Sequence, residues 1–147
     1  NSFFDKIEKK FNYKVVICSH PTAFNNEIHF NNRPVYSHKT VELTYNAEFC
    51  FSHHSNSMNF AVIFKKPILF IYNNEMKELY KNYYMKDLKS LSKNLNMPLI
   101  NVDQKFNYKY PEIDNEVYNN YLNNFIASKE SQNKNTFDII INTLKIK

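Results

Sequence analysis

Residues 48–71 read EFCFSHHSNSMNFAVIFKKPILFI, and this stretch decides the fold. Residues 48–52 form a short apolar run typical of a buried strand, and the polar turn 53–57 follows it. We expect a helix over residues 58–64, which the next proline ends because the residue before a proline disfavours helical geometry. Residues 68–71 supply a second apolar strand. This succession predicts two parallel strands joined by a crossover helix.

The same alternation extends in both directions along the chain. Upstream we expect a helix over residues 2–11 capped by Ser2, a strand over 14–18, a loop over 23–33, a short strand over 34–36 and a helix over 40–46 with Val41 and Leu43 inward. Downstream we expect one long or two broken helices over 75–94, a strand over 98–102 and closing helices over 114–126 and 136–146. The strands are too apolar to face water, which predicts an α/β fold: a doubly wound, Rossmann-like parallel sheet with helices on both faces.

The composition indicates a single domain over residues 1–147, since 43% of the residues are hydrophobic. No apolar run reaches the roughly 20 residues that cross a bilayer, and the start of the chain has no signal-peptide pattern. We therefore expect a soluble, cytoplasmic domain in which Cys18 and Cys50 are free thiols. Because the chain begins with Asn1 and Ser2 rather than Met, we expect it to be part of a longer protein.

Glycine is absent from the chain. Its absence excludes the phosphate-binding Walker loop and the GxGxxG fingerprint, which need glycine for close backbone approach. Compositional bias explains much of the high asparagine content. Asparagine also tolerates left-handed backbone, so we expect it at turns and helix ends where glycine is usual.

Two polar turns are candidates for a binding site, because ligands of open parallel sheets bind beyond the carboxyl ends of the strands. Residues 19–22 follow the first strand, and residues 53–57 follow the strand over 48–52, which predicts both on one rim. Ser55 can cap the next helix, leaving N–H groups and the Ser57 hydroxyl for an anion. His20 can donate a proton or a hydrogen bond to phosphate. The alternative is that both turns are only caps and loop residues.

Metal and nucleic acid are weaker interpretations of the same residues. Five histidines are present, but none has the HxH, HExxH or CxxC spacing of a metal site, so we expect no metal. The formal charge of +5 favours anions, yet the lysines are scattered and the aromatic residues have the spacing of buried positions. We therefore expect no nucleic-acid partner.

The chain resembles the donor-binding domain of bacterial glycosyltransferases with the GT-B architecture, which make surface polysaccharides. The segments that carry the resemblance are residues 15–21, 39–43 and 48–67. The dipeptide His20-Pro21 and the run Ser55-Asn56-Ser57 are similar to the HP and S/SS motifs of bacterial sialyltransferases and polysialyltransferases.

This resemblance implies a role for each matching residue. His20 would be a phosphate ligand and the leaving-group acid, and Pro21 would hold its loop. The run Ser55, Asn56 and Ser57 would bind the donor phosphate at the start of a helix. Thr40 and Glu42 would lie near the base or the ribose.

The resemblance further implies that the chain is one half of a GT-B enzyme of capsule or lipooligosaccharide synthesis. Its substrate would be a CMP- or UDP-linked sugar, with no cofactor. The acceptor half, with the general base, would precede this chain, so the isolated domain would be inactive. The whole protein would act in the cytoplasm, at the inner face of the bacterial membrane, with peripheral membrane association. The alternatives are half of a nucleotide-sugar epimerase and a non-catalytic module that binds a nucleotide or a protein partner.

Overall fold

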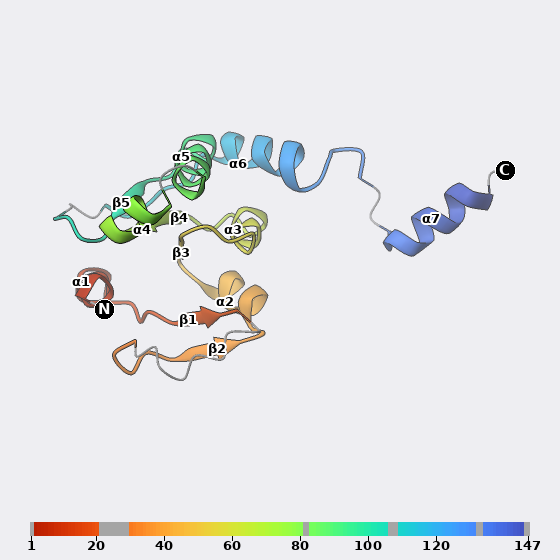
Figure 1. Cartoon of the computed structure of the whole chain (residues 1–147). Coiled ribbons are helices and arrows are strands. Elements are labelled where there is room, and N and C mark those ends of the chain that lie inside the picture. Colours follow the sequence, from red (N-terminus) through yellow and green to blue (C-terminus); the bar gives the residue numbers. More distant parts are fainter. Residues whose placement is uncertain (1, 21–29, 81–82, 106–108, 132–133, 146–147) are drawn as a thin grey trace.

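The computed structural model describes residues 2–20, 30–80, 83–105, 109–131 and 134–145 (Figure 1). Helices and short strands alternate along the chain. In order, the elements are α1 (Ser2–Phe11), β1 (Ile17–Ser19), β2 (Val35–Ser37), α2 (Thr40–Asn46), β3 (Cys50–Ser52), α3 (Met58–Ile63), β4 (Ile68–Tyr72), α4 (Asn74–Leu79), α5 (Tyr84–Asn94), β5 (Leu99–Asn101), α6 (Asn115–Tyr121), the π-helix η1 (Leu122–Ile126) and α7 (Thr136–Lys145).

All strand pairs among the described residues are parallel, which confirms an α/β fold with parallel strands and helices. The sheets are small, and they form only part of a Rossmann-like sheet. β1 pairs with β2, with Ile17 opposite Val35. β3, β4 and β5 form a three-stranded sheet in that order. The described strands are therefore divided between two hydrogen-bonded sheets, and β1 is not hydrogen-bonded to β3.

Helices cover both faces of the three-stranded sheet. Successive side chains of a strand point to opposite faces, so each strand contributes residues to two cores. On one face, Ile68 and Phe70 of β4 belong to a core that includes residues of α3, α5 and α6. On the other face, Phe3 and Ile7 of α1 pack in a cluster that includes Phe51 of β3. The ring centroids of Phe3 and Phe51 lie 5.4 Å apart in an edge-to-face contact.

Several element boundaries differ from the sequence-based expectation. The strand expected over 14–18 is β1, which has three residues and extends from Ile17 to Ser19, so only two residues of the apolar run belong to it. The long helical region is two helices, α4 and α5, and the first closing helix changes from α to π geometry after Tyr121. The prediction that Val41 faces inward is wrong, since its side chain is 48% exposed, whereas Leu43 is half-buried. Most of the loop expected over 23–33 lies outside the described residues.

Asparagine takes left-handed backbone as expected. Among the described residues, Asn12, Asn31, Asn32 and Asn96 have φ between 51° and 58°. Asn12 follows α1, and Asn96 lies just past the end of α5, which are positions where glycine commonly ends a helix. Asparagine therefore replaces glycine at two helix ends.

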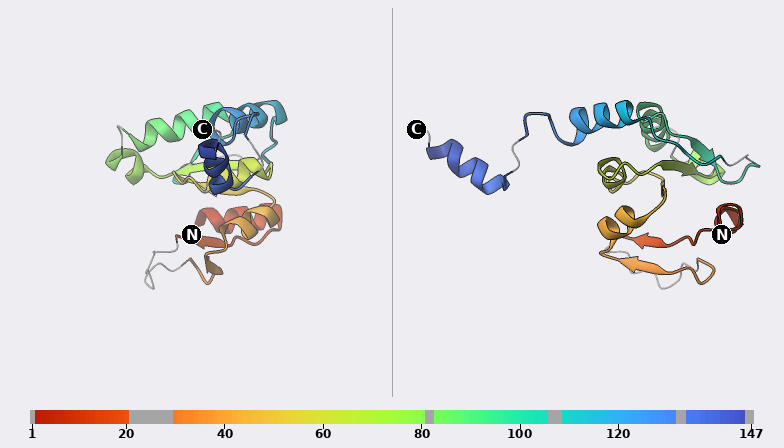
Figure 2. Two further views of the ribbon diagram at one scale, coloured as in Figure 1. Left: turned by 90° about the vertical axis from the view of Figure 1, so that its right-hand side faces the viewer. Right: turned by 180° about the vertical axis from the view of Figure 1, so that it is seen from behind.

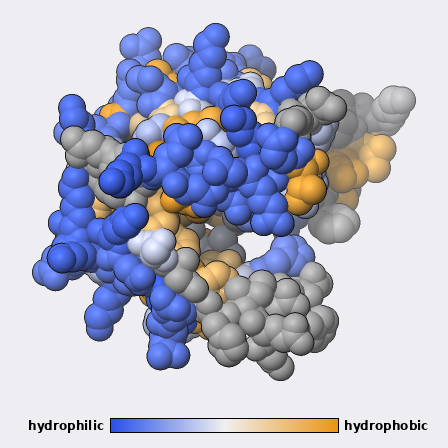
Figure 3. All heavy atoms as spheres, turned by 60° about the vertical axis from the view of Figure 1, so that its left-hand side comes forward, coloured by the Kyte–Doolittle hydropathy of each residue, from blue (hydrophilic) through white to orange (hydrophobic). Residues whose placement is uncertain are grey.

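The C-terminal helix exposes apolar side chains. Figure 3 shows a face on which hydrophilic side chains predominate and apolar residues form small patches. Figure 1 and the right-hand view of Figure 2 show α7 standing apart from the other helices, with Ile140, Ile141 and Leu144 exposed. Within the described residues, no helix combines the length and apolar character needed to span a membrane.

Candidate functional site

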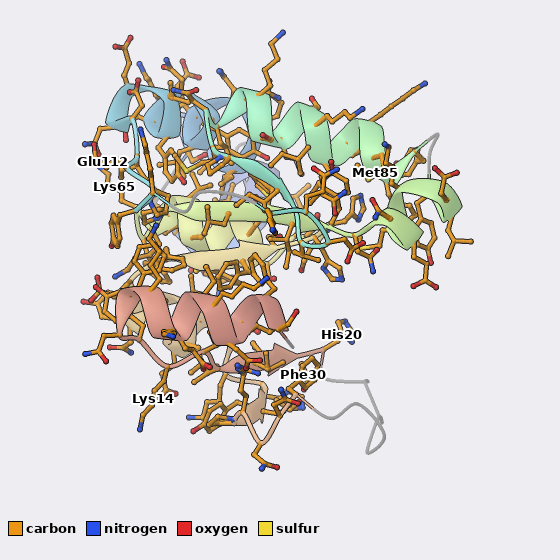
Figure 4. All side chains as sticks on the ribbon, turned by 90° about the vertical axis from the view of Figure 1, so that its left-hand side faces the viewer. Lys14, His20, Phe30, Lys65, Met85 and Glu112 are labelled. Atoms are coloured by element: carbon orange, nitrogen blue, oxygen red, sulfur yellow. The ribbon has the colours of Figure 1, made fainter. Side chains whose placement is uncertain are left out.

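The carboxyl ends of both sheets lie toward the same end of the molecule. Figure 4 shows His20, which follows β1, toward the same end as Met85, near the start of α5. Lys14 and Lys65, which precede β1 and β4, lie toward the opposite end (Figure 4). The two candidate turns therefore follow strands that end at this side, where ligands of parallel sheets bind.

His20 is exposed directly after β1. The neighbouring Ser19 hydroxyl donates a hydrogen bond to the carbonyl oxygen of Tyr36, at 3.4 Å, across the β1–β2 pair. Pro21 lies outside the described residues. Ser19 is thus bonded to the neighbouring strand, and His20 is the first residue after β1.

Ser55 and Ser57 are brought together in the second turn. Their hydroxyl oxygens lie 2.7 Å apart, and the Ser57 N–H donates to Ser55 Oγ at 3.2 Å. Asn56 between them is exposed. Ser55 therefore caps a local turn rather than α3, whose N-cap residue Ser57 makes no side-chain capping bond. The hydroxyl pair presents two donors and acceptors that can rotate toward a ligand.

The backbone N–H groups expected to face an anion are already used. Those of Met58, Asn59 and Phe60 each donate, at 3.1 Å, to the carbonyl three residues earlier. The prediction that N–H groups near Ser55 remain available is wrong for these three residues, because the turn before α3 closes tightly. Side chains are therefore the main groups at this turn that can bind a ligand.

Thr40 and Glu42 both belong to α2 but have different surroundings. Thr40 Oγ1 lies 3.0 Å from Cys18 Sγ, which joins the start of α2 to β1. Glu42 is exposed and accepts a hydrogen bond from Lys39 Nζ at 2.6 Å. That bond raises the pKa of Lys39. Thr40 is therefore attached to the strand that leads to His20, whereas Glu42 is paired on the surface.

The structure adds a residue pair that the sequence did not reveal. His54 has φ of 100°, and its Nε2 lies 3.5 Å from Asp87 Oδ2 of α5. The ring also packs edge-to-face on Tyr84, with centroids 4.3 Å apart. A residue 33 positions away has no detectable signal in local spacing, so Asp87 could not be found from the sequence.

Asparagine and aspartate side chains tie the ends of β4 and β5 together. Asn101 Nδ2 donates to Asn74 Oδ1 at 2.8 Å, and the Asn74 N–H donates to Asp103 Oδ2 at 2.7 Å. Asn73 caps α4 by accepting from the Met76 N–H at 2.7 Å. Beside this network is a pocket of about 100 Å³, lined by His53, Ile71, Tyr72, Asn73, Met76 and Val102.

A larger pocket of about 230 Å³ lies elsewhere, along α6 and η1. Its walls come from Asn94, Val117, Asn120, Tyr121, Asn124 and Phe125, none of which follows a strand. The candidate site is at the strand ends because polar side chains of several loops lie toward that end of the molecule. Within the described part of the chain, no three His, Cys, Asp or Glu side chains are grouped so as to hold a metal ion.

The chain matches no protein-family model, no curated protein and no solved structure.

Proposed function

We propose that this chain is the donor-binding domain of a glycosyltransferase that makes surface polysaccharide or lipooligosaccharide, with a sialyltransferase-like use of a nucleotide sugar. The observation that carries the proposal is the Ser55–Ser57 hydroxyl pair at the carboxyl end of β3, at the end of the molecule toward which His20 also lies. Parallel strands direct ligands to this end.

The chemistry of these groups suits the phosphate of a nucleotide sugar. Hydroxyls and protonated imidazoles both donate hydrogen bonds to phosphate oxygens, and bonds to a charged oxygen are the stronger kind. A chain with a formal charge of +5 attracts such an anion. With no glycine available for a phosphate loop, side-chain donors perform this task.

The other proposed roles come from the resemblance to bacterial sialyltransferases. His20 donates a proton to the departing phosphate, and Pro21 stiffens its loop. Asn56 presents its amide beside the two serines. Thr40, which contacts Cys18 of β1, and Glu42, two residues further along α2, contact the base or the ribose in this proposal.

We expect this domain to bind nucleotide and not to transfer sugar by itself. In a two-domain transferase the reacting groups are positioned in a cleft between the domains, and that positioning supplies much of the rate. The general base and the acceptor site belong to the other half of the proposed enzyme, which acts at the inner face of the membrane.

The proposal is tested by titrating CMP, CDP, UMP and UDP into the protein and following amide chemical shifts. We expect one base to be preferred and the shifts to centre on residues near His20 and Ser55. His20→Ala and Ser55→Ala should weaken binding without lowering the thermal midpoint. Glu112→Gln, an exposed change that Figure 4 places at the opposite end from His20, is the control. Absence of binding at millimolar nucleotide would refute the proposal.

A further inference from the structure

His54 has an unusual backbone conformation at the candidate site. Its φ of 100° is unfavourable for any residue with a side chain. Such backbone outliers persist where the surroundings fix them, and they concentrate at functional sites. The peptide before Ser55 is thus bent in a way that aims the imidazole toward α5.

Two groups of α5 fix the ring. Asp87 Oδ2 lies 3.5 Å from Nε2, and the Tyr84 ring lies edge-to-face at 4.3 Å. These are the titratable groups placed against the imidazole among the described residues. The side chains of His54 and Asp87 are 34% and 44% exposed, so a ligand can reach them.

The pairing assigns the two ring nitrogens different roles. With Nε2 toward the Asp87 carboxylate, that nitrogen carries a proton, and Nδ1 is left for another partner. In the neutral ring Nδ1 is only an acceptor and cannot bond to a phosphate oxygen, whereas in the protonated ring both nitrogens donate.

The neighbouring residues add two hydroxyl groups. Ser55 follows His54 directly, and its hydroxyl is paired with that of Ser57 at 2.7 Å. An imidazole and two hydroxyls therefore come from four consecutive residues. Two residues before His54, the buried Ser52 hydroxyl has no hydrogen-bond partner in the described part of the chain, so the end of β3 contains more polar groups than the fold alone uses.

We propose that His54 binds the donor phosphate through Nδ1, beside the Ser55 and Ser57 hydroxyls, and that Asp87 is the positioning residue that holds its ring. This inference rests on the proposed function and adds a phosphate ligand to it. The ligand class is a phosphate monoester or diester of a nucleotide.

The test compares the affinities of CMP, UMP and inorganic phosphate for the wild type, His54→Asn, Asp87→Asn and the double variant. Asparagine tolerates left-handed backbone, so His54→Asn removes the imidazole while retaining the turn. Glu112→Gln removes the same charge as Asp87→Asn at a distant exposed position and is the matched control. Thermal unfolding of each variant checks the fold.

We expect His54→Asn to weaken CMP or UMP binding about tenfold or more, the usual effect of losing a charge-assisted hydrogen bond. Asp87→Asn should weaken binding less than His54→Asn does, and the double variant should bind no more weakly than His54→Asn alone, because Asp87 acts through the imidazole ring. A further loss of affinity in the double variant would show that Asp87 acts independently of the ring and would overturn its assignment.

The two proposals fail in different ways. If the wild type binds no nucleotide, the proposed function fails and this inference fails with it. If the wild type binds and His54→Asn binds equally well while His20→Ala does not, the donor domain stands and the His54 assignment is wrong.

Discussion

Arg33 and Glu8 form a two-point ion pair, with Arg33 Nη2 at 2.5 Å from Glu8 Oε2 and Nε at 3.2 Å from Oε1. The guanidinium also bonds to Asp5 Oδ1 at 2.5 Å, and its side chain is only 6% exposed. Glu8 Oε1 accepts a further bond from the Val15 N–H at 2.8 Å. One carboxylate thereby connects α1 with the approaches to β1 and β2.

Glu8→Gln should therefore destabilise the protein, because it leaves a buried guanidinium with one fewer charged partner. Hydrogen bonds to charged groups contribute about 1.5–3 kcal/mol, so we expect a loss of about 2 kcal/mol in the free energy of unfolding. Urea unfolding measures this quantity. Glu112→Gln, a loss of the same charge at an exposed loop residue, should change it by no more than about 0.5 kcal/mol. Equal effects of the two substitutions would show that the ion pair contributes nothing.

The same ion pair predicts sensitivity to acid. Hydrogen bonds from Arg33 hold the pKa values of Asp5 and Glu8 below their ordinary values of 3.8 and 4.5. A depressed pKa gives stability that is complete above the unfolded value and is lost as pH falls through the folded one. We expect the wild type to lose stability between pH 5 and pH 3, and Arg33→Met to lose less over that interval. Parallel pH profiles for the two proteins, measured by thermal unfolding, would contradict this.

The two cysteines should differ in reactivity. Burial raises the pKa of the Cys50 thiol to about 11, whereas Cys18 is exposed on β1. Since the thiolate is the reactive form, a disulfide reagent at pH 8 should modify one thiol in the folded protein and the second only after unfolding. Cys18→Ser should abolish the fast phase. A fast phase that persists in this variant would place Cys50 at the surface.

Local patterns predicted the elements well because they depend on neighbouring residues. The spacing of Phe3, Ile7 and Phe11 identified α1, and the apolar run after Pro67 identified β4. Strand pairing is a different matter, since it depends on contacts between distant segments. Nothing in the run before Ser19 shows that β1 pairs with β2, and not with β3, among the described strands.

The site shows the same division between local and distant information. The serine turn could be found from its composition and its place after a strand, and the structure brings Ser55 and Ser57 together. The Asp87 carboxylate beside His54 and the Arg33 guanidinium beside Asp5 are contacts over 33 and 28 residues. No rule of sequence spacing links residues so far apart, so these pairs can be identified only in the folded structure.

Two serines provide a matched test of buried hydroxyls. Ser52 Oγ is buried without a hydrogen-bond partner among the described residues, whereas Ser92 Oγ donates to the Met97 carbonyl at 2.6 Å. Ser92→Ala should lower the free energy of unfolding by about 1 kcal/mol, because it leaves that carbonyl with one fewer donor. Ser52→Ala should leave the free energy unchanged or raise it. Urea unfolding of both variants measures these changes. A larger loss in the free energy of unfolding for Ser52→Ala than for Ser92→Ala would show that the Ser52 hydroxyl has a partner in solution.

Substitution by alanine should have opposite effects on stability at Asn96, which has left-handed backbone, and at Asn94, which is helical. Asn96 follows α5 with φ of 51°, and Asn94 is the last residue of α5. Left-handed backbone costs roughly 1–2 kcal/mol for an ordinary side chain and little for asparagine or glycine. Asn96→Ala should therefore lower the free energy of unfolding by about 1 kcal/mol, and Asn96→Gly should not. Asn94→Ala should raise it slightly, because alanine is the better helix former. Chemical denaturation of the three variants measures the change in the free energy of unfolding. If Asn96→Gly destabilises the protein as much as Asn96→Ala does, the asparagine amide, rather than its backbone angle, stabilises this helix end.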